Sequence, residues 1–201
     1  MTTGQDLLAL SPVMPVVVLD DAADAVPTAR ALLAGGIGVI ELTLRTPAAL
    51  AAIERIAAEV PDIVVGAGTV TAPEHAKQAA DAGAKFLVTP GCTDAVVDAC
   101  FETGLPFLPG ASTVSEAMRL AERGLSALKF FPAEASGGVA YLKSIAGPLP
   151  SLKFCPTGGI TAATAPSYLA LPNVGCIGGS WLTASLDVAT IEKLAAEAAQ
   201  L

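Results

Sequence analysis

The stretch "IVVGAGTVTAPEHAKQAADAG", residues 63–83, decides the fold. Its first part, IVVGAGTV (63–70), is a nearly unbroken apolar run, and its second part, PEHAKQAADAG (73–83), is a helical segment that ends in glycine. Such an apolar run is typical of a parallel strand that is buried on both faces. A glycine such as Gly83 is a common helix stop. The stretch therefore predicts one strand–helix unit.

The same unit recurs along the chain. Apolar strand runs are expected at residues 13–19, 39–44, 63–70, 85–91, 105–110, 127–134, 152–160 and 174–182, each followed by a helical segment. Eight units in 201 residues predict an α/β fold, a (β/α)8 or TIM barrel with a short N-terminal helix, built as a single domain over residues 1–201. A doubly wound open sheet is the alternative, but no G-x-G-x-x-G follows the first strand.

The amino-acid composition indicates which kinds of binding partner are unlikely. The chain is 53% hydrophobic and 15% charged, with a net charge of −8 and no basic cluster. Nucleic acid and anionic membranes are therefore disfavoured as partners, and burial of apolar surface in a homo-oligomer is favoured. The N-terminus has no basic region, and the first arginine is Arg30. No apolar run is long enough to span a bilayer, so we expect a cytoplasmic protein.

Histidine and cysteine chemistry is also disfavoured. Cys92, Cys100, Cys155 and Cys176 have no paired metal-ligand spacing and are read as small buried apolar residues. The one histidine, His75, lies in a helical segment and is expected on its surface. A histidine-based triad or a multi-histidine metal site would depend on this one residue, so no metal is predicted.

One of the apolar runs contains a lysine. Lys129 lies within ALKFFPAE (127–134), and a buried ammonium costs several kcal/mol unless it is paired or loses its proton. Side chains alternate along a strand, so Leu128 and Phe130 face the helices while Lys129 points into the barrel. A structural lysine neutralised by a nearby carboxylate is one interpretation. A nucleophile is the other.

The same parity in VIELTLR (39–45) turns Glu41 inward and places Arg45 at the C-terminal mouth. Residues Glu41, Arg45, Thr69, Lys129 and Thr157 all come from the C-terminal ends of different strands, where barrel active sites form. Glu41 could merely pair with Lys129 or Arg45 in the core. The convergence of several ionisable groups on one rim favours a catalytic role instead.

Two glycine pairs follow the last two strands. They lie in PTGGI (156–160) and IGGSW (177–181), at the loops where such barrels frequently bind phosphate. Between Lys153 and Lys193 there is no lysine or arginine. A phosphate at these loops would therefore depend on backbone N–H groups and on the hydroxyls of Thr157 and Ser180.

Six motifs together resemble one known family. They are IELTLRT (40–46), VGAGTV (65–70), PGASTVSE (109–116), LKFFPAE (128–134), CPTGGI (155–160) and CIGGSWL (176–182). They are similar to the 2-keto-3-deoxy-6-phosphogluconate (KDPG) aldolases, in the right order through nearly the whole chain. The resemblance implies a class I, metal-independent aldolase that needs no cofactor and is usually a homotrimer.

The resemblance also implies residue roles. Lys129 would form the Schiff base and Glu41 would be the general acid/base. The remaining residues would bind substrate: Arg45 and Thr69 at the carboxylate, Pro90 and Phe131 along the wall, and Thr157, Gly158, Gly159, Gly179 and Ser180 around the phosphate.

The implied reaction cleaves KDPG, a phosphorylated 2-keto-3-deoxy sugar acid, to pyruvate and D-glyceraldehyde 3-phosphate in the Entner–Doudoroff pathway. Many members of the family also act on 4-hydroxy-2-oxoglutarate. Two alternatives stay open at this point: an aldolase for the galactonate analogue of KDPG, and an engineered or natural assembly scaffold built on the same barrel. A metal-dependent aldolase fits poorly because one histidine is too few for the usual metal site.

Overall fold

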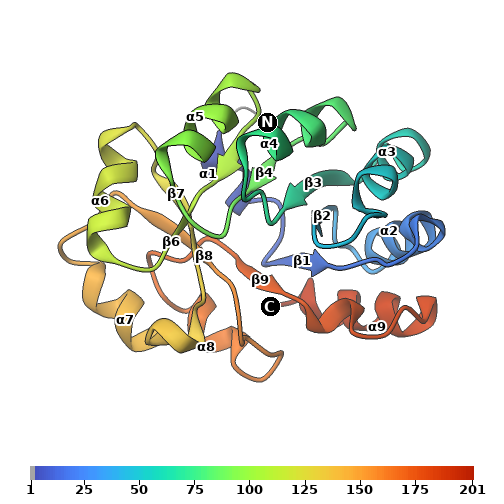
Figure 1. The fold of residues 1–201 in the computed structure, drawn as a ribbon. Helices are drawn as coiled ribbons and strands as arrows, with labels where there is room; N and C mark the ends of the chain where they lie inside the picture. Colours follow the sequence, from blue (N-terminus) through green and yellow to red (C-terminus); the bar gives the residue numbers. More distant parts are fainter. Residues whose placement is uncertain (1–2) are drawn as a thin grey trace.

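The computed structural model describes residues 3–201, in which short strands alternate with helices (Figure 1). The strands are β1 (Val13–Val17), β2 (Val39–Thr43), β3 (Val64–Gly68), β4 (Leu87–Val88), β5 (Phe107–Leu108), β6 (Gly110–Ala111), β7 (Ala127–Phe130), β8 (Lys153–Pro156) and β9 (Ile177–Gly179). The α-helices are α1 (Gly4–Leu8), α2 (Ala25–Ala34), α3 (Ala49–Glu59), α4 (Pro73–Asp81), α5 (Asp94–Glu102), α6 (Val114–Glu122), α7 (Gly138–Ile145), α8 (Ala165–Leu169) and α9 (Val188–Ala198). Three 3-10 turns complete the described chain: η1 (Ala22–Asp24), η2 (Glu134–Ser136) and η3 (Trp181–Thr183).

All strand pairs are parallel. One sheet has six strands in the order β5-β4-β3-β2-β1-β9, and the other has three in the order β6-β7-β8. An isolated parallel bridge between Thr157 and Gly178 brings the end of β8 beside β9. Helices α2 to α9 surround the strands (Figure 1). The fold is therefore an α/β fold with a barrel-like arrangement of parallel strands.

The predicted strand over 105–110 is divided in the structure. β5 ends at Leu108 and β6 begins at Gly110, with Pro109 between them. Proline has no N–H and cannot donate to a neighbouring strand. Its carbonyl still accepts a hydrogen bond from the Lys129 N–H, at 2.9 Å. The sequence thus predicted the position of this strand correctly and missed its interruption.

Helix ends follow the glycine signals. Gly83, Gly104 and Gly124 lie two residues past the ends of helices α4, α5 and α6, and each has a positive φ, of 93°, 69° and 84° respectively. This backbone region is open to glycine at little cost, which is why glycine so often follows a helix. These three predicted helix stops are confirmed.

The predicted N-terminal helix is α1, which packs beneath β7. The Nε2 of Gln5 donates to the Ser126 carbonyl at 3.2 Å, and a Cβ placed on Gly4 would lie 3.0 Å from the Cβ of Ala127. α1 therefore covers the end of the fold where strand β7 begins. Arg45, Thr69 and Thr157 lie at the opposite end, where strands β2, β3 and β8 finish.

Strands β1, β2 and β7 are buried at every residue. That burial explains their apolar sequences, because one side of each strand packs under helices and the other faces the interior of the barrel-like sheet. Glu41 and Thr43 on β2 and Lys129 on β7 differ from the rest of these strands, because they are polar side chains that are at most 4% exposed. These buried polar groups mark the interior as more than an apolar core.

Candidate active site

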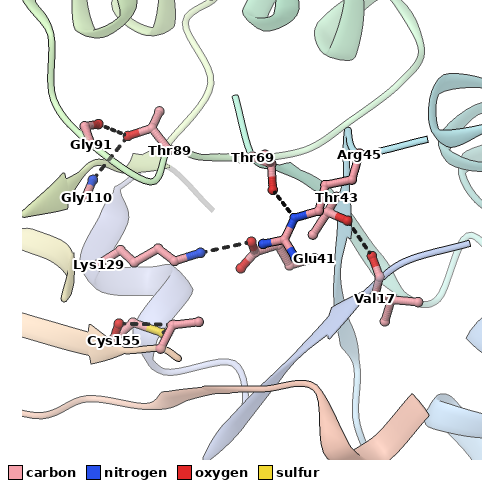
Figure 2. Close-up of polar contacts among 11 residues, drawn as sticks. Val17, Glu41, Thr43, Arg45, Thr69, Thr89, Gly91, Gly110, Lys129 and Cys155 are labelled. Atoms are coloured by element: carbon pink, nitrogen blue, oxygen red, sulfur yellow. Dashed lines mark hydrogen bonds and ion pairs between the residues drawn. The ribbon is translucent and has the colours of Figure 1, made fainter. Parts of the chain in front are cut away.

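Lys129 and Glu41 form an ion pair in the interior. The distance from Lys129 Nζ to Glu41 Oε1 is 3.2 Å, and the side chains are 5% and 1% exposed. Lys129 comes from β7 and Glu41 from β2, which are not neighbours in either sheet. Figure 2 shows the lysine side chain extended toward the carboxylate. The inward direction that strand parity predicted for both residues is confirmed.

Glu41 has room only because β3 ends in a glycine. A Cβ placed on Gly68 would lie 2.1 Å from Glu41 Oε1 and 2.6 Å from its Cγ, well inside van der Waals contact. Gly68 pairs with Thr43 on β2, so the glycine sits one pleat beyond Glu41. Its missing side chain thus leaves the space that the carboxylate occupies.

Arg45 and Thr69 lie just past the ends of β2 and β3. The Arg45 Nε donates to the Thr69 Oγ1 at 3.1 Å (Figure 2). Thr69 has a φ of 60°, an uncommon conformation for a β-branched residue, and such strained residues cluster at functional sites. Arg45 is exposed at this rim and presents a fork of donors suited to a carboxylate.

Thr89 is a further buried polar residue near this rim, and the sequence pattern did not indicate it. This residue is fully buried, its hydroxyl donates to the Gly91 carbonyl, and it accepts from the Gly110 N–H at 3.1 Å (Figure 2). It thereby ties the turn that contains Pro90 to the start of β6. A Cβ on Gly110 would lie 2.3 Å from the carbonyl carbon of Pro90, so the two segments are in close contact. A threonine between Val88 and Pro90 gave no sequence signal for this bond.

Phe131 and the loop after β8 form the next part of the rim. The Lys129 Nζ lies 5.4 Å from the centre of the Phe131 ring, within the range of a cation–π contact. A Cβ on Gly158 would lie 3.3 Å from the same ring. Phe131 therefore lies between the lysine and the first loop glycine.

The loop Thr157–Gly159 has an unusual backbone. Gly158 and Gly159 have φ values of 104° and 80°, which glycine adopts readily and other residues do not. Thr157 is 7% exposed, and its hydroxyl lies 3.4 Å from the Cys155 carbonyl as a donor. The bridge between Thr157 and Gly178 brings this loop beside the end of β9, where Gly179 is buried and Ser180 is exposed.

Among the cysteines, Cys155 contacts this cluster, with its Sγ 3.8 Å from the Thr157 Oγ1. All four cysteines are free thiols. Burial raises the pKa of Cys100 to about 11, and a hydrogen bond to Cys155 together with burial raises the pKa of Cys176. His75 on α4 is partly exposed, as expected of a residue on the surface of its helix.

Metal-binding clusters and membrane-spanning helices are both absent from residues 3–201. No group of three or more His, Cys, Asp or Glu side chains there could hold a metal ion. In the same part of the chain, each helix is too short or too polar to cross a membrane.

Comparisons with known proteins agree on one family. The family described as KDPG and KHG aldolase matches residues 5–195. The 2-dehydro-3-deoxy-phosphogluconate aldolase of Pseudoalteromonas atlantica is 52% identical over 180 residues, which are 90% of this chain and 84% of that protein. The KHG/KDPG aldolase of Escherichia coli is 48% identical over 204 residues, covering 99% of this chain and 96% of that protein.

A solved structure extends the likeness to three dimensions. The KDPG aldolase of Legionella pneumophila, with pyruvate captured at low pH as a covalent carbinolamine intermediate, matches with a TM-score of 0.95. It is 42% identical in sequence, and the match covers 98% of each chain.

Proposed function

The chain belongs to the KDPG and KHG aldolase family, and from this premise we propose that it cleaves 2-dehydro-3-deoxy-6-phosphogluconate to pyruvate and D-glyceraldehyde 3-phosphate in the Entner–Doudoroff pathway. The observation that carries the proposal is the buried pair of Lys129 Nζ and Glu41 Oε1, 3.2 Å apart. A nucleophilic amine beside a proton acceptor is what Schiff-base chemistry requires. Cleavage of 4-hydroxy-2-oxoglutarate to pyruvate and glyoxylate would use the same groups.

The first half of the reaction forms the imine. Glu41 accepts a proton from Lys129, and the free amine attacks the C2 ketone of the substrate to give a carbinolamine. Glu41 returns its proton to the carbinolamine hydroxyl, which leaves as water. This gives an iminium on Lys129, which is an electron sink for the bond that must break, and restores Glu41 as a carboxylate. No metal or other cofactor enters this step.

The second half breaks the C3–C4 bond. Glu41, as the carboxylate, takes the proton of the C4 hydroxyl, the aldehyde leaves, and the electron pair of the broken bond moves into an enamine. Glu41 then returns that proton to C3, and water hydrolyses the resulting iminium to release pyruvate. One carboxylate serves as base and then as acid, as its position beside Lys129 allows.

The rim residues bind the two ends of the substrate. Arg45 and Thr69 would hold the carboxylate next to the ketone, and Pro90 and Phe131 would line the wall. The phosphate would lie at Thr157, Gly158, Gly159, Gly179 and Ser180. Support for this phosphate site comes from the positive φ angles of Gly158 and Gly159 and from the bridge that joins the two loops.

We also propose a closed (β/α)8 barrel, a single domain over residues 1–201, a homotrimer and a cytoplasmic location. The bridge at Thr157–Gly178 and the direct continuation of the chain from β5 in one sheet through Pro109 to β6 in the other support closure of the barrel. Phe101 and Met118, which are 44% and 48% exposed, support burial against other subunits. Native mass spectrometry would give the number of subunits.

Reduction with borohydride in the presence of pyruvate tests the mechanism. A pyruvate-derived mass is expected on Lys129, mapped by peptide mass spectrometry. An unmodified Lys129 in protein that cleaves KDPG would refute the Schiff base. The same protein should be assayed with KDPG, its galactonate analogue and 4-hydroxy-2-oxoglutarate, because the three kcat/KM values decide the substrate.

Two further variants test the assigned roles. Glu41→Gln should lower kcat by about 10²–10⁴-fold, the range for loss of a general acid/base. Arg45→Ala should chiefly raise KM, because the arginine holds the substrate without touching the bonds that change. The reverse pattern would contradict both assignments.

A further inference from the structure

A buried tyrosine holds a carboxylate beside the loop Thr157–Gly159. The hydroxyl of Tyr168, on α8, donates a hydrogen bond to Glu134 Oε1, on η2. Tyr168 is 1% exposed, whereas Glu134 is an exposed residue. Burial and the neighbouring carboxylate raise the pKa of Tyr168, so its hydroxyl remains protonated and able to donate at neutral pH.

The backbone of the same segment is bonded directly to the loop. The Ala133 N–H donates to the Thr157 carbonyl at 2.8 Å, and the Glu134 N–H donates to the Gly158 carbonyl at 3.1 Å. A Cβ on Gly159 would lie 2.7 Å from the Cγ of Glu134. The stem of Glu134 therefore packs on Gly159, while its carboxylate is held by Tyr168.

We propose that Tyr168 and Glu134 are positioning residues for the phosphate end of the substrate, an inference that rests on the proposed function. With no lysine or arginine between Lys153 and Lys193, the loop can offer a phosphate only backbone N–H groups and hydroxyls. The strength of such a site depends on the directions of those N–H groups. A contact that holds the loop in place therefore determines the affinity of the site for phosphate.

The carboxylate itself gives the contact a second role. Glu134 lies against Gly159, so an unrestrained carboxylate could turn toward a bound phosphate and repel it. The bond from Tyr168 keeps that oxygen occupied. Loss of the phenol hydroxyl would thus loosen the loop and free a negative charge beside it, and both effects weaken binding of a dianion.

The test is Tyr168→Phe, assayed with KDPG and with 2-dehydro-3-deoxygluconate, which is the same substrate without phosphate. We expect KM for KDPG to rise about 5–10-fold, the size of one lost hydrogen bond. The kcat/KM for the unphosphorylated acid should stay within twofold, and borohydride should trap pyruvate on Lys129 as in wild type. An equal loss with both substrates, or no loss with either, would overturn the inference.

Matched variants distinguish a loss of phosphate positioning from a defect in folding. Tyr141→Phe removes the other tyrosine hydroxyl of the chain, from a ring that stacks on Phe130 at 5.2 Å, and should leave the ratio of the two substrates unchanged. Glu134→Ala should raise KM for KDPG less than Tyr168→Phe does, because it loosens the loop but leaves no free charge beside it, and Glu134→Gln, which retains the stem and an acceptor oxygen, should lose less than Glu134→Ala. Because Glu134 is exposed, these variants test the inference even if Tyr168→Phe folds poorly.

The double variant Tyr168→Phe, Glu134→Ala should be no worse than either single variant, because both remove one bond. Fully additive losses would contradict a shared role. If wild-type protein fails to cleave KDPG, the proposed function fails together with this inference. If wild type is active and the substrate ratio does not move in Tyr168→Phe, this inference fails alone.

Discussion

Two lysine–carboxylate pairs in this protein have similar geometry and opposite surroundings. Lys77 and Asp81, one turn apart on α4, are 2.6 Å apart with side chains that are 78% and 66% exposed. Lys129 and Glu41 are 3.2 Å apart and almost completely buried. The closer pair is the weaker one, because water screens the charges of exposed groups and no such screening reaches the interior.

The difference teaches what burial does to the same two functional groups. Taking both charges out of water costs several kcal/mol per ion, and their attraction repays this cost only in part. The buried pair therefore adds little to the stability of the fold, but it strongly constrains the positions of Lys129 and Glu41. Loss of the Lys77–Asp81 pair on α4 should lower the free energy of unfolding only slightly. In the interior, loss of one partner leaves the other charge without compensation.

The largest expected effect comes from breaking the buried pair. Lys129→Met should abolish the imine and lower turnover by about 10⁴-fold or more, as loss of a covalent nucleophile does. It should also lower the free energy of unfolding by about 3–5 kcal/mol at pH 7, because Glu41 remains buried and unpaired. Urea unfolding and an assay for pyruvate release measure the two effects.

The double variant Lys129→Met, Glu41→Leu sharpens the same comparison. Replacing both charges by apolar side chains of similar size should restore most of the lost stability, while activity stays absent. If the double variant is as unstable as Lys129→Met, the Lys129–Glu41 pair does stabilise the fold. The contrast with the Lys77–Asp81 pair on α4 is then wrong.

The second prediction displaces Glu41 without changing its charge. Gly68→Ala puts a methyl group where Glu41 Oε1 now lies, at 2.1 Å. A shift of the carboxylate by about 1 Å should cost about 10²-fold in kcat/KM, and overpacking should lower stability by about 1–3 kcal/mol. Gly38→Ala is the control, since its Cβ would meet no atom within 4 Å. Equal effects of the two variants would show that Gly68 has no special relation to Glu41.

The positions of Lys129 and Glu41 could be predicted because strand geometry is local. Side chains alternate with a period of two, so a polar residue in an apolar run has only two possible directions. The helix stops at Gly83 and Gly124 were equally accessible, because a residue's tolerance of positive φ is a property of that residue alone. These predictions needed no knowledge of which segments meet in space.

The contacts between distant segments could not be predicted in the same way. Thr89 bonds to Gly110, and Tyr168 bonds to Glu134 across 34 positions of the chain. Neither pairing leaves a periodic pattern in the sequence, because each depends on the positions that separate loops adopt in the folded protein. The break at Pro109 was visible as a proline, yet whether it interrupts a strand depends on the partner strand.

A third prediction concerns a carboxylate with surroundings between the two extremes. Glu116 is partly buried at the start of α6 and accepts from the Ser112 and Thr113 N–H groups, each at 2.9 Å. The Ser112 backbone bond is the main reason that the pKa of Glu116 lies below its ordinary value. Its stabilisation is therefore complete above about pH 4.3, the ordinary pKa of glutamate, and is lost as the pH falls through the lowered pKa.

Glu116→Gln should lower the free energy of unfolding by about 1 kcal/mol at pH 7, in line with other helix-capping interactions. The gap from wild type should shrink as the pH falls toward 3, because the wild-type carboxylate then becomes neutral as well. Urea unfolding between pH 7 and pH 3 measures this difference in the free energy of unfolding. Glu122→Gln, in the last turn of the same helix and exposed, is the control. A gap that does not change with pH would rule out the carboxylate as its source.

The smallest expected effect is at the exposed pair. Lys77→Ala should change the free energy of unfolding by at most about 0.5 kcal/mol and leave kcat/KM for KDPG within experimental error. Even that small change should diminish in 1 M salt, because the Debye length falls to about 3 Å there. A loss comparable to that of Lys129→Met would mean that distance, and not burial, sets the strength of these pairs. The short contact on α4 would then be the stronger of the two, and the special status of the interior pair would have to come from its chemistry alone.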